Sequence, residues 1–307
     1  MLKNIVFMGT SNFAVPILKS LYQNGYAISC VYTQPPSKSN RGQKLNKSPV
    51  NLISETLNIE VRTPHRLKNN EVEEIFLKKI NPSLIIVVSY GQLIPKNLLE
   101  IPKNGFINVH ASLLPKWRGA APIQRAIMNL DGKTGISIIK LNENLDEGPI
   151  INKYEFKISE NMNASELSEN LANLASQKII DNLDNIFEGK AKFEDQNNLD
   201  ATYAKKIDKL EGKINWRETA ENIMGKINGL HPSPGAWFLF NSERYKILKA
   251  EISNAKGEIG MVLNDNFEIG CKNKSIKILT IQREGKKIQN INEFVLGTKI
   301  KKGTCII

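Results

Sequence analysis

The sequence has few cysteines and no long apolar run. Its three cysteines, Cys30, Cys271 and Cys305, are far apart, and no two of them form a CxxC pair. This spacing argues against a zinc site and a disulfide framework, and it is typical of a protein in a reducing cytosol. No apolar run approaches the length needed to span a bilayer, and residues 1–7 lack the organisation of a signal peptide. We therefore expect a cytoplasmic protein with neither a membrane partner nor a bound metal.

The chain carries an excess of positive charge that is concentrated in its last third. It has 307 residues, a length that suggests two domains, and a formal net charge of +11. From residue 205 onward, 19 Lys and Arg stand against 11 Asp and Glu. Such a basic segment is expected where a protein meets nucleic-acid phosphates. An abundance of Lys and Asn can also reflect the base composition of a genome, so charge alone does not establish this partner.

The first half of the sequence alternates between strand and helix patterns. Residues 4–8 have the pattern of a short buried strand, a helix with one apolar face follows over 13–24, and a second strand follows over 27–33. Residues 83–89 are apolar between two serines, as a parallel strand covered on both faces should be. This order predicts βαβ units and an open α/β sheet. Further helices are expected at 50–57, 70–79, 121–128 and 163–189, and a further strand at 105–109.

Beyond residue 206 the pattern changes to short alternating strands. Residues 216–227 suggest one helix. Short strands separated by Gly, Asn and Lys predict a small β-barrel or sandwich. The strands are expected near 236–240, 245–252, 259–263, 267–271 and 276–281. The polar stretch before this region is typical of a linker. We therefore predict a first domain over 1–189, a linker over 190–205 and a second domain over 206–307.

Asn108, His110 and Asp146 are the candidate catalytic residues. Asn108 and His110 are two positions apart at an expected strand end, so both side chains can leave the same face. A carboxamide N–H can stabilise a developing oxyanion, and an imidazole can carry a proton between an amine and a leaving group. A carboxylate could orient that imidazole. This chemistry suits acyl transfer, although Asn108 and His110 alone would equally fit a polar strand end before a loop.

The same segment resembles the signature of the folate-dependent formyltransferases. Asn108, His110 and Asp146 match the catalytic triad of that family one by one. The resemblance covers nearly the whole chain, and the other matching segments are 112–115, 118–120, 145–149, 7–13, 89–95, 214–216 and 232–237. It implies an α/β fold with a Rossmann-like N-terminal formyltransferase domain and a C-terminal OB-like β-barrel domain.

The resemblance also implies a co-substrate and the residues that bind it. The family uses 10-formyltetrahydrofolate, a reduced folate, and no metal. Three loops at expected strand ends match one folate pocket, and open α/β sheets bind ligands at this edge. The residues expected to contact folate are Tyr90, Gly91, Ile94, Ser112, Leu113, Leu114, Pro115 and Glu143. Trp117 could be a core residue or a stacking platform, and the two other histidines, His65 and His231, have no matching role.

The segment 33–49 is long for a strand-to-helix connection and contains four basic residues and no acid. In an arbitrary protein it would be a solvated basic loop. Family members that act on tRNA carry a similar insertion with an Arg-Gly pair, which Arg41-Gly42 matches. The turn 9–13 lacks the GxGxxG pattern, so its glycine is best explained by a tight turn. The residues that the resemblance places near the amine substrate are Thr10, Phe13, Arg41, Gly42 and Lys44.

These observations predict an enzyme of one-carbon transfer. The expected reaction moves a formyl group from 10-formyltetrahydrofolate to the α-amino group of methionine on initiator methionyl-tRNA, for translation initiation. We expect the chain to act as a monomer in the cytoplasm. One alternative is another folate-dependent N-formyltransferase or a formyl-folate hydrolase, against which the basic loop and basic C-terminal region count. The other is a non-catalytic RNA-binding protein, against which the complete triad counts.

Overall fold

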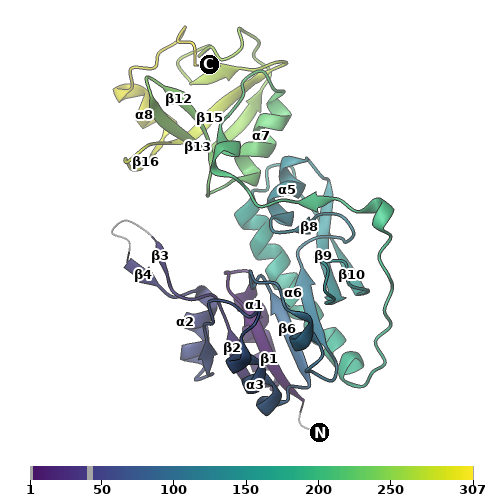
Figure 1. Cartoon of the computed structure of the whole chain (residues 1–307). Helices are drawn as coiled ribbons and strands as arrows, with labels where there is room; N and C mark the ends of the chain where they lie inside the picture. The colour runs from purple at the N-terminus through teal and green to yellow at the C-terminus, as the bar shows by residue number, and fades with distance from the viewer. Residues whose placement is uncertain (1–2, 40–43, 307) are drawn as a thin grey trace. The chain divides into compact units, whose positions relative to one another are not determined.

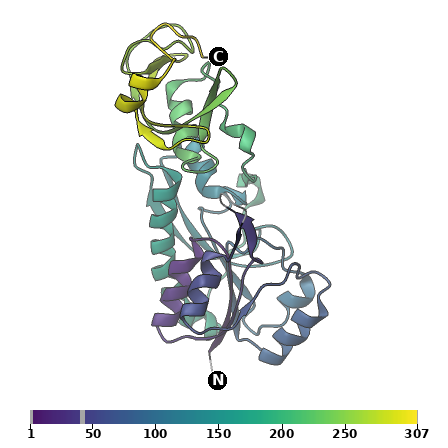
Figure 2. The same cartoon turned by 90° about the vertical axis from the view of Figure 1, so that its left-hand side faces the viewer.

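The computed structural model describes residues 3–39 and 44–306, and the chain divides into two compact units. The first unit comprises Met1–Ala120, Thr134–Phe156 and Ser168–Ala204, and the second comprises Ala121–Lys133, Lys157–Leu167 and Lys205–Ile307. The elements of each unit can be followed in Figures 1 and 2. Neither unit is continuous in sequence, because helix α5 (Pro122–Met128) groups with the C-terminal segment.

A seven-stranded sheet forms the centre of the first unit, with strand order β10-β9-β7-β6-β1-β2-β5. Strand β1 pairs in parallel with β2 and β6, and β6 pairs in parallel with β7, whereas β9 is antiparallel to β7. The expected Rossmann-like α/β architecture is therefore confirmed, with three further strands, β5, β9 and β10, that the sequence did not reveal. The strands are β1 Asn4–Gly9, β2 Ala27–Tyr32, β5 Val61–Arg62, β6 Leu84–Val88, β7 Phe106–His110, β9 Lys133–Lys140 and β10 Ile150–Lys157.

One long helix of this part of the chain begins and ends at clear local sequence signals. The helix expected over 163–189 begins with a reciprocal capping pair, in which Glu166 N–H donates to Asn163 Oδ1 (3.1 Å) and Asn163 N–H donates to Glu166 Oε2 (3.0 Å). Gly189, at φ 69°, follows the end of that helix. The helices are α1 Ala14–Gln23, α2 Pro49–Thr56, α3 Glu71–Ile80, α4 Lys96–Leu99 and α6 Ala164–Phe187. None in the described part of the chain is long and apolar enough to cross a membrane.

The basic segment 33–49 contains a short hairpin that the sequence did not predict. Strands β3 (Ser37–Ser39) and β4 (Lys44–Asn46) pair in antiparallel fashion, with Ser37 opposite Asn46 and Ser39 opposite Lys44. The candidate substrate residues Arg41 and Gly42 lie outside the described residues. Lys44 is described only through its backbone, as a residue of β4.

The second unit contains a curled antiparallel sheet that forms a half-barrel, as expected for a small β domain (Figure 1). Its strands are β12 Ala236–Phe240, β13 Glu243–Ser253, β14 Glu268–Gly270, β15 Ser275–Arg283 and β16 Ile288–Asn290, with helices α7 Ala220–Gly229 and α8 Ile291–Gly297. The core holds a chain of aromatic contacts through Trp216, Phe238, Tyr245 and Phe294. Burial of these large rings supplies much of the hydrophobic stabilisation of the unit.

Two sequence expectations in this region are wrong. The helix expected from residue 216 begins only at Ala220, because Thr219 caps it by accepting from Asn222 N–H (3.3 Å) and Trp216 is a core residue instead. The strand expected over 259–263 is absent. Met261 and Val262 form only isolated bridges, to Cys305 and Ile269. Trp216 and Val262 are buried in the core of this unit, although neither lies in a helix or strand.

Candidate active site

The structure brings the three candidate catalytic side chains together in the first unit. Asn108 and His110 lie at the end of β7, and Asp146 lies in the turn before β10. Asn108 Nδ2 donates to Asp146 Oδ1 at 3.3 Å, and His110 Nδ1 lies 3.6 Å from Asp146 Oδ2. Asn108 is 8% exposed and His110 is 6% exposed, so the cluster is largely shielded from water. Low solvent access strengthens the electrostatic interactions among these groups.

The backbone around Asp146 is held in an uncommon conformation. Asp146 has φ 53°, in the left-handed region that few residues other than glycine adopt. Its Oδ2 accepts a 2.8 Å hydrogen bond from Gly119 N–H, so the carboxylate is fixed from a second loop. Close packing also requires Gly148, because a Cβ there would lie 1.7 Å from the carbonyl oxygen of Lys140. This turn therefore presents the carboxylate in one defined position.

The ring of His110 is held on its other side by Trp117. His110 Nε2 lies 2.8 Å from the Trp117 carbonyl oxygen. Since a carbonyl can only accept, Nε2 is the donor in this arrangement, and Nδ1 faces Asp146. The sequence offered a core or stacking role for the Trp117 side chain and gave no sign of this contact, because a backbone carbonyl makes it.

The residues expected to contact folate lie in three loops that meet around Leu141. Leu141 packs with Tyr90 and Ile94 in one apolar cluster and with Leu114 in another. The Tyr90 side chain is buried, and burial raises the pKa of its hydroxyl. The backbone carbonyl oxygen of Tyr90 accepts a hydrogen bond from Thr10 Oγ1 at 3.0 Å. These contacts place apolar side chains and backbone polar groups at one edge of the sheet, as a planar heteroaromatic ligand requires.

Other candidate folate residues serve the local structure of their loops. Ser112 is fully buried and donates to the Lys116 carbonyl oxygen (2.6 Å), and Leu114 N–H donates to Ser137 Oγ (3.0 Å). The exposed Glu143 forms an ion pair with Lys96 at 3.1 Å. The remaining candidate folate residues lie in the same loops: Gly91, Leu113 and Pro115. These loops therefore offer a ligand mainly their backbone and partly exposed atoms.

Of the residues expected near the amine substrate, two are described in full. Thr10 bridges two loops, because it donates to the Tyr90 carbonyl oxygen and accepts from Gln34 N–H at 3.4 Å. The Phe13 side chain is only 5% exposed and lies directly before α1. Within the described residues, no group of three or more His, Cys, Asp and Glu side chains could hold a metal ion.

Comparison with known families agrees with this arrangement. Residues 3–183 match the sequence profile described as formyl transferase, and residues 206–299 match the profile described as formyl transferase, C-terminal domain. The chain belongs to the formyl transferase family. The family expected from the sequence motifs is therefore confirmed, and so is the enzyme class.

Relatives within this family match the chain from end to end. A methionyl-tRNA formyltransferase of Pelagibacter ubique is 61% identical over 100% of this chain and 99% of that protein. Another, of Caulobacter vibrioides, is 41% identical over 98% of this chain and 99% of the relative. A third, of Rickettsia massiliae, is 40% identical, with the same coverage of both chains.

Solved structures share the fold at lower identity. A sugar 3N-formyl transferase, WlaRD, crystallised with dTDP and 5-N-formyl-THF, has a TM-score of 0.69 at 22% identity. The match covers 94% of this chain and all of that chain. HypX from Aquifex aeolicus in complex with tetrahydrofolic acid has a TM-score of 0.65 at 16% identity, covering 98% of this chain and 49% of HypX. These likenesses establish a shared fold.

Proposed function

We propose that this chain transfers the formyl group of 10-formyltetrahydrofolate to the α-amino group of methionine on initiator methionyl-tRNA. The observation that carries the proposal is the cluster of the buried Asn108 and His110 with the partly buried Asp146, in a chain 61% identical, over its full length, to a methionyl-tRNA formyltransferase. Because it serves translation initiation, we place its action in the cytoplasm. We also propose that it acts as a monomer.

The cluster can carry the steps of an acyl transfer. The neutral amine attacks the formyl carbon, and the carbonyl oxygen becomes an oxyanion. Asn108 Nδ2 has two hydrogens, and its single bond to Asp146 leaves the second available to that oxyanion. His110 then moves the proton lost by the amine toward the departing folate nitrogen, and Asp146 keeps the ring oriented. The new C–N bond forms as the bond to folate breaks.

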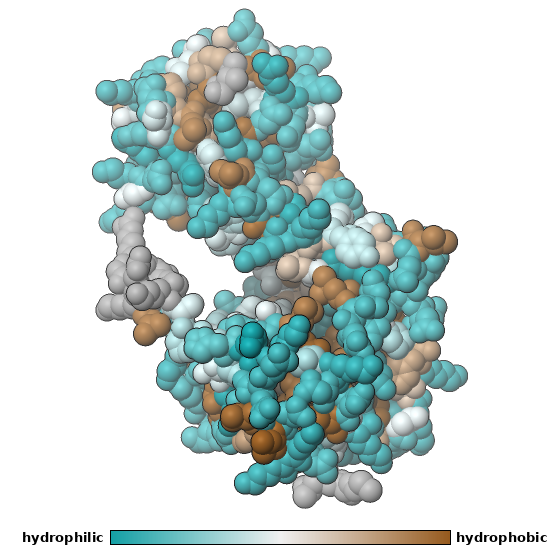
Figure 3. Space-filling view, in the orientation of Figure 1, coloured by the Kyte–Doolittle hydropathy of each residue, from teal (hydrophilic) through white to brown (hydrophobic). Residues whose placement is uncertain are grey.

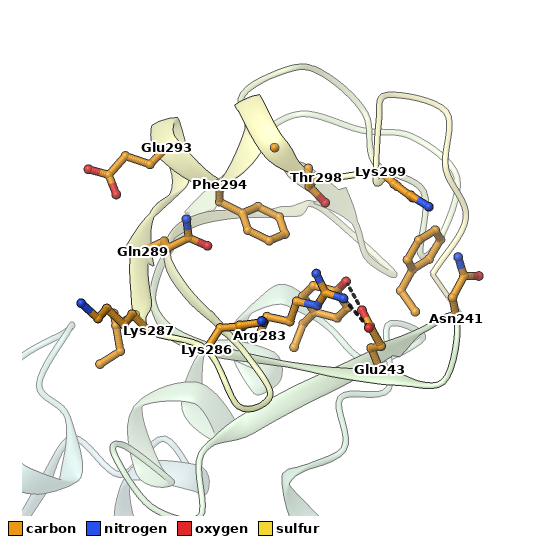
Figure 4. A pocket seen from close by; sticks show the side chains of 14 residues that line it. Asn241, Glu243, Arg283, Lys286, Lys287, Gln289, Glu293, Phe294, Thr298 and Lys299 are labelled. Carbon is orange, nitrogen blue, oxygen red and sulfur yellow. Dashed lines mark hydrogen bonds and ion pairs between the residues drawn. The ribbon is translucent and has the colours of Figure 1, made fainter.

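The second unit has a basic hollow suited to the phosphates of tRNA. This cavity, of about 680 Å³, lies between β13, β15, β16 and α8 and is drawn in Figure 4. On its floor Arg283 pairs with Glu243 and holds the pKa of that carboxylate below its ordinary value. Around it are the exposed side chains of Lys286, Lys287 and Lys299, which no carboxylate of the described residues engages in an ion pair. Exposed lysines outside ion pairs attract phosphates, and their binding releases the counterions that surround the nucleic acid.

The test is an assay with two amine acceptors in parallel, with deacylated tRNA, which carries no methionyl amine, as the binding control. The purified protein is supplied with 10-formyltetrahydrofolate and methionyl initiator tRNA, deacylated tRNA or a dTDP-linked aminosugar, and formylated products are identified by mass spectrometry. Formylmethionyl-tRNA as the main product supports the proposal. Formylation of the aminosugar alone would make the chain a sugar enzyme. Loss of formyl-folate without any formylated acceptor would identify a hydrolase. Binding of deacylated tRNA without turnover would identify an RNA-binding protein.

A further inference from the structure

The side chain of Gln196 links the polar segment 190–205 to the turn that carries Asp146. Its amide nitrogen donates to the carbonyl oxygens of Asp146 (2.7 Å) and Gly148 (2.8 Å). Its amide oxygen accepts from Arg118 Nε (3.1 Å) and Nη2 (2.8 Å). A carboxamide offers two donors and one oxygen with two lone pairs, so this side chain uses its full hydrogen-bonding capacity.

The buried side chain of Arg118 holds the Gln196 carboxamide in place. The guanidinium is fully buried, and it must be satisfied because an unpaired buried charge is strongly unfavourable. Its Nη1 lies 3.1 Å from Glu147 Oε1, and its Nη2 also donates to Asn198 Oδ1 at 2.8 Å. Arg118 thus joins Glu147, next to Asp146 in the turn, to Gln196 and Asn198 from a segment some 50 positions later.

The backbone of the segment 190–205 is also anchored beside the site. Glu194 bridges Ile150, at the start of β10. Strand β11 (Tyr203–Ala204) pairs with β8 (Arg118–Gly119). Gln196 therefore belongs to a segment that is hydrogen-bonded on both sides of it, and its side chain is held where the Asp146 turn needs a donor.

We propose that Gln196 is a positioning residue for Asp146. The two hydrogen bonds to the turn carbonyls hold Asp146 at φ 53°, while Gly119 N–H holds its carboxylate against His110. Without the carboxamide donors, the turn can relax toward a more common backbone conformation and withdraw the carboxylate from His110 and Asn108. The inference rests on the proposed formyl transfer, in which Asp146 orients His110.

The principal variant is Gln196→Glu, which keeps oxygen acceptors for Arg118 and removes both donors to the turn. Gln196→Met provides a second variant without the added charge. In both, we expect kcat to fall about 10- to 100-fold, the range for displacement of a reacting group by up to an ångström. The KM values for folate and tRNA should stay within about two-fold of the parent, because only orientation changes. Gln177→Glu, at an exposed site on α6, is the matched control.

Two further measurements separate positioning from a general structural role. In an Asp146→Asn background, Gln196→Glu should lower kcat little further, because both changes disturb the same interaction between Asp146 and His110. The ring nitrogen NMR signals of His110 should move in the Gln196 variants, while those of His65 stay in place. Three outcomes would each overturn the inference. The first is turnover equal to that of the control variant, and the second is a loss of kcat that adds fully in the double variant. The third is a loss of kcat that follows the fall in melting temperature. If the parent formylates no tRNA, the proposed function fails, whereas the His110 signals still decide the positioning: movement supports it and no movement refutes it.

Discussion

The triad in the first unit and the basic hollow in the second present polar groups in opposite ways. Asn108 and His110 are buried, Asp146 is mostly shielded from water, and hydrogen bonds from neighbouring loops hold the three side chains. Lys286 and Lys287 are exposed, and among the described residues neither forms a contact ion pair with a carboxylate. Bond formation requires fixed geometry, whereas attraction of a polyanion requires mainly the number of charges. Changes in the triad should therefore have large, salt-independent effects, and changes in the hollow small, salt-dependent ones.

The face of the molecule drawn in Figure 3 is mainly hydrophilic, with hydrophobic residues in small groups. Isolated exposed apolar side chains are normal for soluble proteins. The contrast between the two polar regions is therefore the more informative guide to function.

The largest effect is expected for His110→Ala. Loss of the proton carrier should lower kcat by about 100- to 10,000-fold, the usual range for general acid–base catalysis. Steady-state kinetics with methionyl-tRNA measures this, and circular dichroism checks that the fold is intact. Near-normal turnover in the folded variant would exclude His110 as the proton carrier.

Asn108→Ala should have the next largest effect. Removal of a single oxyanion donor lowers kcat by about 100- to 1,000-fold. The same kinetic assay applies, and the loss should be unchanged between low and high salt because the residue is buried. A raised KM for tRNA with an unchanged kcat would show that Asn108 serves substrate binding rather than catalysis.

Gly148→Ala tests whether the turn geometry matters to the site. The added Cβ would lie 1.7 Å from the Lys140 carbonyl oxygen, so the turn must shift. We expect kcat to fall about 10- to 100-fold through displacement of Asp146. Gly132→Ala is the control, because its Cβ would meet nothing within 4 Å. Equal turnover in the two variants would contradict the requirement for a close approach.

Arg41→Ala addresses the predicted tRNA contact outside the described residues. Arginine is permanently charged and can reach phosphates or base edges. Loss of one such contact should raise KM for methionyl-tRNA by about 10-fold while folate binding, measured by calorimetry, is unchanged. Parent-like use of tRNA at every salt concentration would make the segment 33–49 a solvated loop.

The smallest effect is expected for Lys286→Gln and Lys287→Gln. Each change should weaken tRNA binding about two- to three-fold and reduce the slope of log K against log salt by about 0.7 to 0.9. Filter binding with deacylated tRNA across salt concentrations measures both. Lys178→Gln is the control. Lys178 forms an ion pair with Asp181 on α6, so this variant removes one positive charge outside the hollow and should leave the slope unchanged. Equal slopes for all three variants would show that the hollow does not bind tRNA.

The sequence alone determined the elements whose signals are local. The apolar run at β6 predicted a buried parallel strand, and α6 begins at the local capping pair Asn163 and Glu166, where the helix was expected. Asn108 and His110 share a face because they are two positions apart on β7. The motifs also indicated the family, which the comparisons confirm. In each case the interacting residues are neighbours in the chain, so spacing and residue type carry the information.

Only the tertiary structure decided how the site is assembled. The approach of Asp146 to His110 depends on a left-handed backbone at Asp146, on Gly119 from another loop and on Gln196 from 50 positions away. The His110 contact with Trp117 uses a backbone carbonyl, which every residue type possesses and no sequence pattern marks. Such contacts arise when separate loops are packed against one sheet edge. Their partners are therefore fixed by the fold as a whole rather than by any local run of residues.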